Sequence, residues 1–142
     1  MNKILIRHVQ ESDKDFWFSL DKHLPTAEFD KKVRDGQGYV IFSENRPVGI
    51  LRYNLFWDNT PFCTLLYVDD KFQGKGYGKA LMNFWEREMA ALGYDWVLVS
   101  TQSDETAQHF YRKLGYKDCG SLLPPSQPTE LFLGKSIKSN KI

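Results

Sequence analysis

The sequence has few cysteines, little net charge and no long apolar run. Its two cysteines, Cys63 and Cys119, lack metal-site spacing, and their small number suits a reducing compartment rather than a disulfide-rich secreted fold. A net charge of +1 without long blocks of one sign argues against a nucleic-acid-binding surface. No segment approaches transmembrane length, and the first apolar run is too short for a signal peptide. We therefore expect a cytoplasmic globular protein with no metal, no nucleic-acid partner and no membrane partner.

The length and the pattern of apolar residues indicate one α/β domain over residues 1–142. The 142 residues suffice for a single core and are too few for two ordinary domains. Periodicity and turn residues predict alternating strands and helices, and the prolines of residues 123–128 predict a loop because proline cannot donate to a strand ladder. Residues 138–142 read as a polar tail. The predicted strands are 3–9, 38–44, 47–57, 62–68, 94–100, 116–119 and 130–136, and the predicted helices are 11–22, 25–35, 76–92 and 104–114.

The most informative segment is a glycine-dense turn between a predicted strand and a predicted helix. Glycines at 74, 76 and 78 permit positive φ angles and remove side chains that would keep a ligand away from the backbone. The N–H groups of this turn also begin a helix, where they have no internal partners and lie at the positive end of the helix dipole. The segment therefore predicts a phosphate site.

Two familiar phosphate motifs do not fit this turn. A Walker A loop would require glycine in place of Gln73 and serine or threonine in place of Ala80. A dinucleotide fingerprint starting at Gly74 would require glycine in place of Lys79. Neither a nucleotide triphosphate loop nor a Rossmann turn is therefore indicated.

Two segments together resemble the GNAT family of N-acetyltransferases. Residues 73–78, Gln-Gly-Lys-Gly-Tyr-Gly, resemble the family signature Gln/Arg-x-x-Gly-x-Gly/Ala. Residues 107–116 resemble its downstream motif, a short helix carrying Phe110 and Tyr111 that ends in Leu-Gly-Tyr, where Gly115 is placed to form a left-handed cap. The resemblance extends over about residues 4–137. It implies a mixed central sheet of about six to seven strands, splayed between the fourth and fifth strands and flanked by about four helices.

The resemblance also implies a co-substrate and the residues that hold it. The co-substrate is acetyl-CoA, and Tyr111 corresponds to the tyrosine that can protonate the leaving thiolate; the alternative is that Tyr111 is a core aromatic. Asp104 stands where many relatives carry an asparagine that touches the pantetheine arm. The implied cofactor-binding residues are Leu66, Val68, Gln73, Gly74, Lys75, Gly76, Gly78, Lys79 and Asp104.

The acceptor implied by the family is a primary amine of a small molecule or peptide. Trp17, Phe29, Trp57 and Asp58 are candidate substrate-binding residues, because aromatic rings and a carboxylate suit a cationic amine. The alternative for Trp17 and Phe29 is that they are core residues of amphipathic helices. Residues 62–68 contain no carboxylate, so the amine proton passes to water or to a carboxylate from elsewhere. A non-catalytic acyl-CoA-binding regulatory module and an interaction domain without cofactor stay open, as do the identity of the amine and the oligomeric state, including a homodimer.

Overall fold

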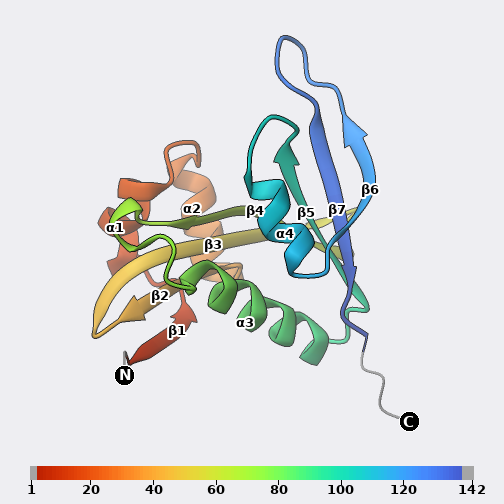
Figure 1. Ribbon diagram of the computed structural model, residues 1–142. Helices are drawn as coiled ribbons and strands as arrows, with labels where there is room; N and C mark the ends of the chain where they lie inside the picture. Colours follow the sequence, from red (N-terminus) through yellow and green to blue (C-terminus); the bar gives the residue numbers. More distant parts are fainter. Residues whose placement is uncertain (1–2, 139–142) are drawn as a thin grey trace. The chain divides into compact units, whose positions relative to one another are not determined.

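The structure is a computed structural model that describes residues 3–138, and all predicted elements are present with bounds shifted by a few residues (Figure 1). Residues 139–142 of the predicted polar tail lie outside the described residues. No helix in residues 3–138 is long and apolar enough to cross a membrane. The strands are β1 (Ile4–His8), β2 (Gly38–Ser43), β3 (Arg46–Phe56), β4 (Thr60–Val68), β5 (Trp96–Gln102), β6 (Lys117–Leu122) and β7 (Glu130–Ser136). The helices are α1 (Lys14–Leu20), α2 (Thr26–Asp35), α3 (Tyr77–Ala91) and α4 (Ala107–Lys113), with short 3-10 helices η1 (Glu11–Asp13) and η2 (Asp70–Phe72).

The seven strands form one mixed sheet in the order β1-β2-β3-β4-β5-β7-β6. β4 and β5 are parallel, whereas β1–β2, β2–β3, β5–β7 and β6–β7 are antiparallel. The predicted mixed sheet flanked by four helices is confirmed. The β4–β5 register comprises only Phe62↔Leu98 and Cys63↔Val99 in the described chain, which agrees with the predicted splay.

The chain forms two compact units made of interleaved segments. The first contains residues 1–53 and 65–85, and the second contains residues 54–64 and 86–142. The strands β3 and β4 and the helix α3 contribute residues to both units. The prediction of a single domain over residues 1–142 stays a prediction.

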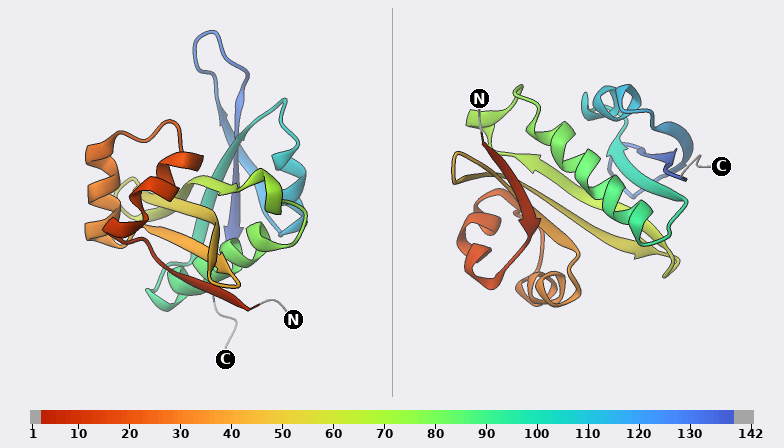
Figure 2. Two further views of the ribbon diagram at one scale, coloured as in Figure 1. Left: turned by 90° about the vertical axis from the view of Figure 1, so that its left-hand side faces the viewer. Right: turned by 90° about the horizontal axis from the view of Figure 1, so that it is seen from below.

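Alternation along the central strands builds the core of the first unit. Val40 and Ile50 pack in one cluster with Trp17 of α1 and Phe29 of α2, and the latter two rings meet edge to face at 5.8 Å. On the other face, Tyr39 of β2 meets Phe84 of α3 at 5.4 Å. Accordingly, α1 and α2 lie on one face of these strands and the start of α3 lies on the other (Figure 2).

A buried carboxylate joins three elements of the second unit. Glu86 of α3 accepts the hydroxyl hydrogen of Tyr116 at 2.7 Å and a hydrogen from the Lys135 ammonium of β7, also at 2.7 Å. The Tyr116 ring also meets the Tyr111 ring of α4 at 5.9 Å. Because a buried carboxylate needs such donors, this network fixes the second half of α3 relative to β7 and the end of α4.

A second buried carboxylate, Asp21, follows α1 in the first unit. Its Oδ2 accepts hydrogen bonds from Arg52 of β3 at 2.8 Å and from the Trp17 indole at 3.1 Å. Burial alone would raise the pKa of Asp21. The hydrogen bond and charge of Arg52, with further hydrogen bonds from His23 and Trp17, outweigh the effect of burial, so the pKa lies below its ordinary value. The ionised Asp21 carboxylate therefore stabilises the folded state at pH values above its unfolded-state pKa. This stabilisation is lost as the pH falls through its lower folded-state pKa.

We expect Asp21→Asn to lower the free energy of unfolding by about 2–4 kcal/mol near neutral pH, because it removes a buried charge partner of Arg52. The acid-induced loss of stability below about pH 4 should also become shallower. Urea unfolding from about pH 7 to pH 2 measures both effects. Asp30→Asn, at an exposed position of α2, is the matched control. An Asp21→Asn protein as stable as wild type at neutral pH would contradict this account.

Candidate functional site

The predicted phosphate segment, residues 73–79, consists of a turn at residues 73–76, between η2 and α3, and the first three residues of α3; we call the whole segment the glycine turn. Gly74 and Gly76 have φ angles of 77° and 89°, the left-handed region in which residues with side chains are strained. A Cβ atom added at either position would have no neighbour within 4 Å. Gly78 lies inside α3. The first two glycines thus leave open space beside the backbone.

Five main-chain N–H groups of this segment have no acceptor among residues 3–138. The first hydrogen bond that enters α3 runs from Ala80 N to Gly76 O at 3.0 Å. Within residues 3–138, the N–H groups of Gly74, Lys75, Gly76, Gly78 and Lys79 donate to no acceptor. They lie at the positive end of a 15-residue helix, and the side chains of Lys75 and Lys79 are exposed beside them. This arrangement is suited to bind an anion with several oxygens, such as a pyrophosphate.

The Gln73 side chain contacts the protein itself. Its Nε2 donates to Val68 O at 3.0 Å and to Asp70 Oδ1 at 3.1 Å. Both partners are acceptors, so the amide nitrogen must face them. Gln73 therefore ties the glycine turn to the end of β4, and its side-chain nitrogen does not face outward.

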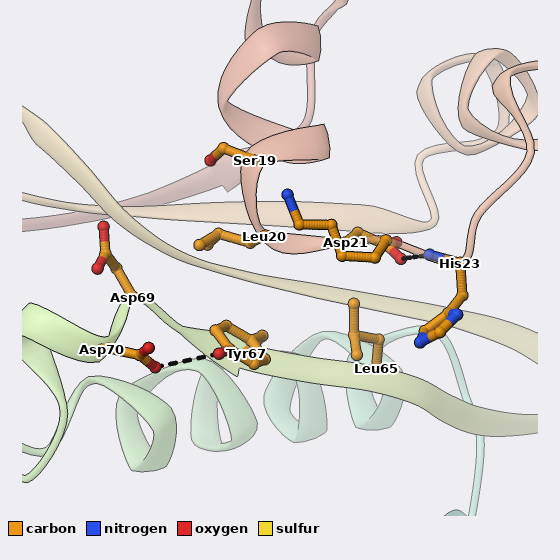
Figure 3. Close-up of a pocket in the computed structure, with 9 residues that line it drawn as sticks. Ser19, Leu20, Asp21, His23, Leu65, Tyr67, Asp69 and Asp70 are labelled. Carbon is orange, nitrogen blue, oxygen red and sulfur yellow. Dashed lines mark hydrogen bonds between the residues drawn. The ribbon is translucent and has the colours of Figure 1, made fainter.

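The first unit contains a pocket of about 600 Å³ that the sequence did not predict (Figure 3). Leu65 and Tyr67 of β4 and the following Asp69 line one side at alternating positions, while Leu66 and Val68 occupy the intervening positions. Asp69 and Asp70 lie near one end and His23 lies at the other (Figure 3). Alternation along β4 was a usable signal for this wall, whereas the opposite wall is formed by the end of α1 and the loop that follows it. The complete lining is Ser19, Leu20, Asp21, Lys22, His23, Leu65, Tyr67, Asp69 and Asp70.

Two carboxylates of this pocket have no cationic partner. Asp69 accepts the main-chain N–H of Lys71, and Asp70 accepts the Tyr67 hydroxyl and the Gln73 amide. Neither forms an ion pair within the described chain. Asp21, in contrast, is paired with Arg52. The pocket therefore combines an apolar wall with two carboxylates that can attract a cation.

The predicted acceptor residues do not line this pocket. The side chains of Trp17 and Phe29 have no exposed surface, so the structure favours the alternative that both are core residues. Trp57 and Asp58 form the turn between β3 and β4 in the second unit, with φ angles of 56° and 62°. Trp57 is 72% exposed. Their role in substrate binding stays a prediction.

Tyr111 of α4 lies buried in the second unit, and no hydrogen bond joins its hydroxyl to the described residues. Burial, with smaller contributions from Cys63 and Glu105, raises the pKa of Tyr111 well above its ordinary value. The hydroxyl thus stays protonated and is available as a donor.

Gly115, after this helix, has the predicted left-handed conformation with φ of 99°. Asp104 is exposed in the preceding turn.

Comparisons with known proteins agree with this fold. The model of the acetyltransferase (GNAT) family matches residues 6–116. Similar structures include Ard1 from Thermoplasma volcanium, with 17% identity, a TM-score of 0.85 and coverage of 96% of this chain and 99% of that one. The ribosomal-protein-S18-alanine N-acetyltransferase from Escherichia coli has 14% identity, a TM-score of 0.79 and coverage of 98% and 97%. A GNAT acetyltransferase from Elizabethkingia anophelis, solved with acetyl-CoA bound, has 16% identity, a TM-score of 0.73 and coverage of 94% and 97%.

Among curated proteins, the comparison finds no relative by sequence. The family model covers most of the chain, and the structural neighbours share its fold over nearly their whole length. The chain therefore belongs to the GNAT acetyltransferase family.

Proposed function

We propose that the protein transfers the acetyl group of acetyl-CoA to a primary amine of a small molecule or peptide. The observation that carries this proposal is that five N–H groups of the glycine turn, those of residues 74–76 and 78–79, donate to no acceptor in residues 3–138. Membership of the GNAT family supports an acetyl transfer, and the Elizabethkingia neighbour was solved with acetyl-CoA. The Escherichia coli neighbour, an N-acetyltransferase of a protein alanine, supports an amine acceptor.

In this proposal the glycine turn holds the pyrophosphate and the pocket in the first unit receives the amine. Gly74 and Gly76 let the phosphate oxygens approach the backbone, and Lys75 and Lys79 add positive charge. Leu65 and Tyr67 contact the apolar part of the acceptor, and Asp69 and Asp70 attract it as an ammonium ion. Leu66 and Val68 offer main-chain groups to the pantetheine arm and the thioester carbonyl.

The reaction needs a neutral amine, a stabilised oxyanion and a departing sulfur. The bound ammonium ion first loses one proton to water and becomes a neutral amine. Its nitrogen then attacks the thioester carbonyl, the carbon–sulfur bond breaks to release the coenzyme A thiolate, and a second proton leaves the nitrogen to water. The Tyr111 hydroxyl donates a hydrogen bond to the leaving sulfur. Its raised pKa keeps it protonated but makes complete transfer of its proton costly, so it acts mainly by stabilising the thiolate.

We expect Gly76→Val to weaken acetyl-CoA binding at least about tenfold, because it blocks hydrogen bonds to phosphate that contribute about 1.5–3 kcal/mol each. The matched control is Gly93→Val, since Gly93 also has a positive φ, at 99°, and open space beside it, but follows the other end of α3. Both variants should lose similar stability from backbone strain. Calorimetry of both proteins gives the two affinities. Equal acetyl-CoA affinity in the two folded variants would contradict the assignment.

We expect Tyr111→Phe to lower turnover about a hundredfold, because it removes the donor that stabilises the leaving thiolate, with little change in the Michaelis constant for acetyl-CoA. Stability should change by less than about 0.5 kcal/mol, because the hydroxyl makes no hydrogen bond in the described chain. Free thiol release with a panel of amines measures turnover, and Tyr94→Phe, at a half-buried tyrosine of the same unit, is the control. A loss below about threefold would rule out a major role for this hydroxyl.

Acetyl-CoA binding by the wild-type protein without transfer to any amine would identify a non-catalytic acyl-CoA-binding module instead.

A further inference from the structure

One oxygen atom of Asp70 joins the pocket to the glycine turn. Its Oδ1 accepts the hydroxyl hydrogen of Tyr67 at 3.0 Å, and it also accepts a hydrogen from the Gln73 amide at 3.1 Å. Tyr67 lines the pocket, and Gln73 is the first residue of the glycine turn. The dashed bond in Figure 3 shows the Tyr67 ring held at the pocket wall by this carboxylate. The two halves of the proposed site therefore share a hydrogen-bond acceptor.

The remaining contacts of Gln73 fix the backbone that leads into the turn. Its amide also donates to Val68 O, so it bridges the last residue of β4 and the side chain of Asp70. Within the bridged segment, Phe72 N donates to Asp69 O at 2.8 Å and Lys71 N donates to Asp69 Oδ1. Gln73, just before Gly74, is thus held in place by hydrogen bonds of its side chain and not by the main-chain hydrogen bonds of a strand or helix.

The carboxylate makes these bonds stronger than bonds between neutral groups. The hydrogen bond to Asp70, together with its negative charge, raises the pKa of the Tyr67 hydroxyl, so this hydroxyl remains a donor. Loss of the hydrogen bond from the Tyr67 hydroxyl would leave the Asp70 carboxylate and Gln73 freer to move, since no cation in residues 3–138 pairs with Asp70. A change in the position of Tyr67 at the pocket wall can therefore alter the position of the glycine turn through the short path Tyr67, Asp70 and Gln73.

We propose that Asp70 is a positioning residue that couples the Tyr67 wall of the acceptor pocket to the geometry of the coenzyme-binding turn. This inference rests on the proposed function. An acceptor that packs on the Tyr67 ring would fix its hydroxyl, and through Asp70 and Gln73 it would hold the glycine turn in its binding geometry. Because coupling between two sites is reciprocal, a bound coenzyme would in turn favour binding of the acceptor.

The test is the affinity for coenzyme A of variants that alter only this path. Tyr67→Phe keeps the pocket wall and the main chain, yet we expect it to raise the Kd for coenzyme A about fivefold. Asp70→Ala should have at least the same effect, and Asp70→Asn should recover part of it because the amide keeps one acceptor oxygen. The double variant Tyr67→Phe, Asp70→Ala should bind no more weakly than Asp70→Ala alone, because both changes interrupt the same path.

The control is Ser19→Ala, which removes a pocket hydroxyl that donates to Phe16 O and has no link to the turn. Thermal unfolding of every variant separates positioning from stability, since a merely structural role would shift the melting temperature together with Kd. Unchanged affinity in Tyr67→Phe, or additive losses in the double variant, would overturn the coupling. Failure of the wild-type protein to bind coenzyme A would instead overturn the proposed function, and the coupling with it.

Discussion

The start of α3 must leave several main-chain N–H groups without carbonyl partners, and the arrangement around the candidate site depends on this constraint. Gly74 and Gly76 satisfy it by adopting φ angles that residues with side chains avoid. Two hydrogen bonds then hold the backbone that precedes these glycines: Lys71 N donates to the Asp69 carboxylate, and the Gln73 side-chain amide donates to Val68 O at the end of β4. The result is a hydrogen-bonded segment that leads into a turn whose donors are available to an anion.

The strand β4 serves both parts of the proposed site because its side chains alternate. Leu65, Tyr67 and the following Asp69 line the pocket, whereas the carbonyl of Val68 anchors the Gln73 amide. In the proposed site, a strand that ends beside the glycine turn thus brings the acceptor pocket close to the coenzyme-binding turn. The Tyr67, Asp70 and Gln73 contacts add a direct connection between them.

Local sequence signals predicted the elements and the turn, but not the pocket. Glycine spacing and apolar periodicity indicated the positive φ angles of Gly74, Gly76 and Gly115 and the order of strands and helices. Gly78, which the sequence groups with the first two, instead lies inside α3 and has no positive φ. Trp17 and Phe29 were ambiguous because an aromatic residue at helical spacing suits either a core or a binding surface, and packing decides between them. The pocket lies between β4 and the end of α1 with its following loop, segments that are distant in sequence. The orientation of the Gln73 amide depends on Val68 O and Asp70, contacts that no motif reports.

In the proposed site, the main-chain amides of the glycine turn bind the pyrophosphate of the coenzyme. Backbone amide NMR of the full chain during titration with coenzyme A measures this directly, residue by residue. We predict the largest saturable shifts at Gly74, Gly76, Gly78 and Lys79, whereas Gly93, a positive-φ glycine beyond the other end of α3, should shift little. Saturation of the protein with coenzyme A while these four amides stay unchanged would contradict the account.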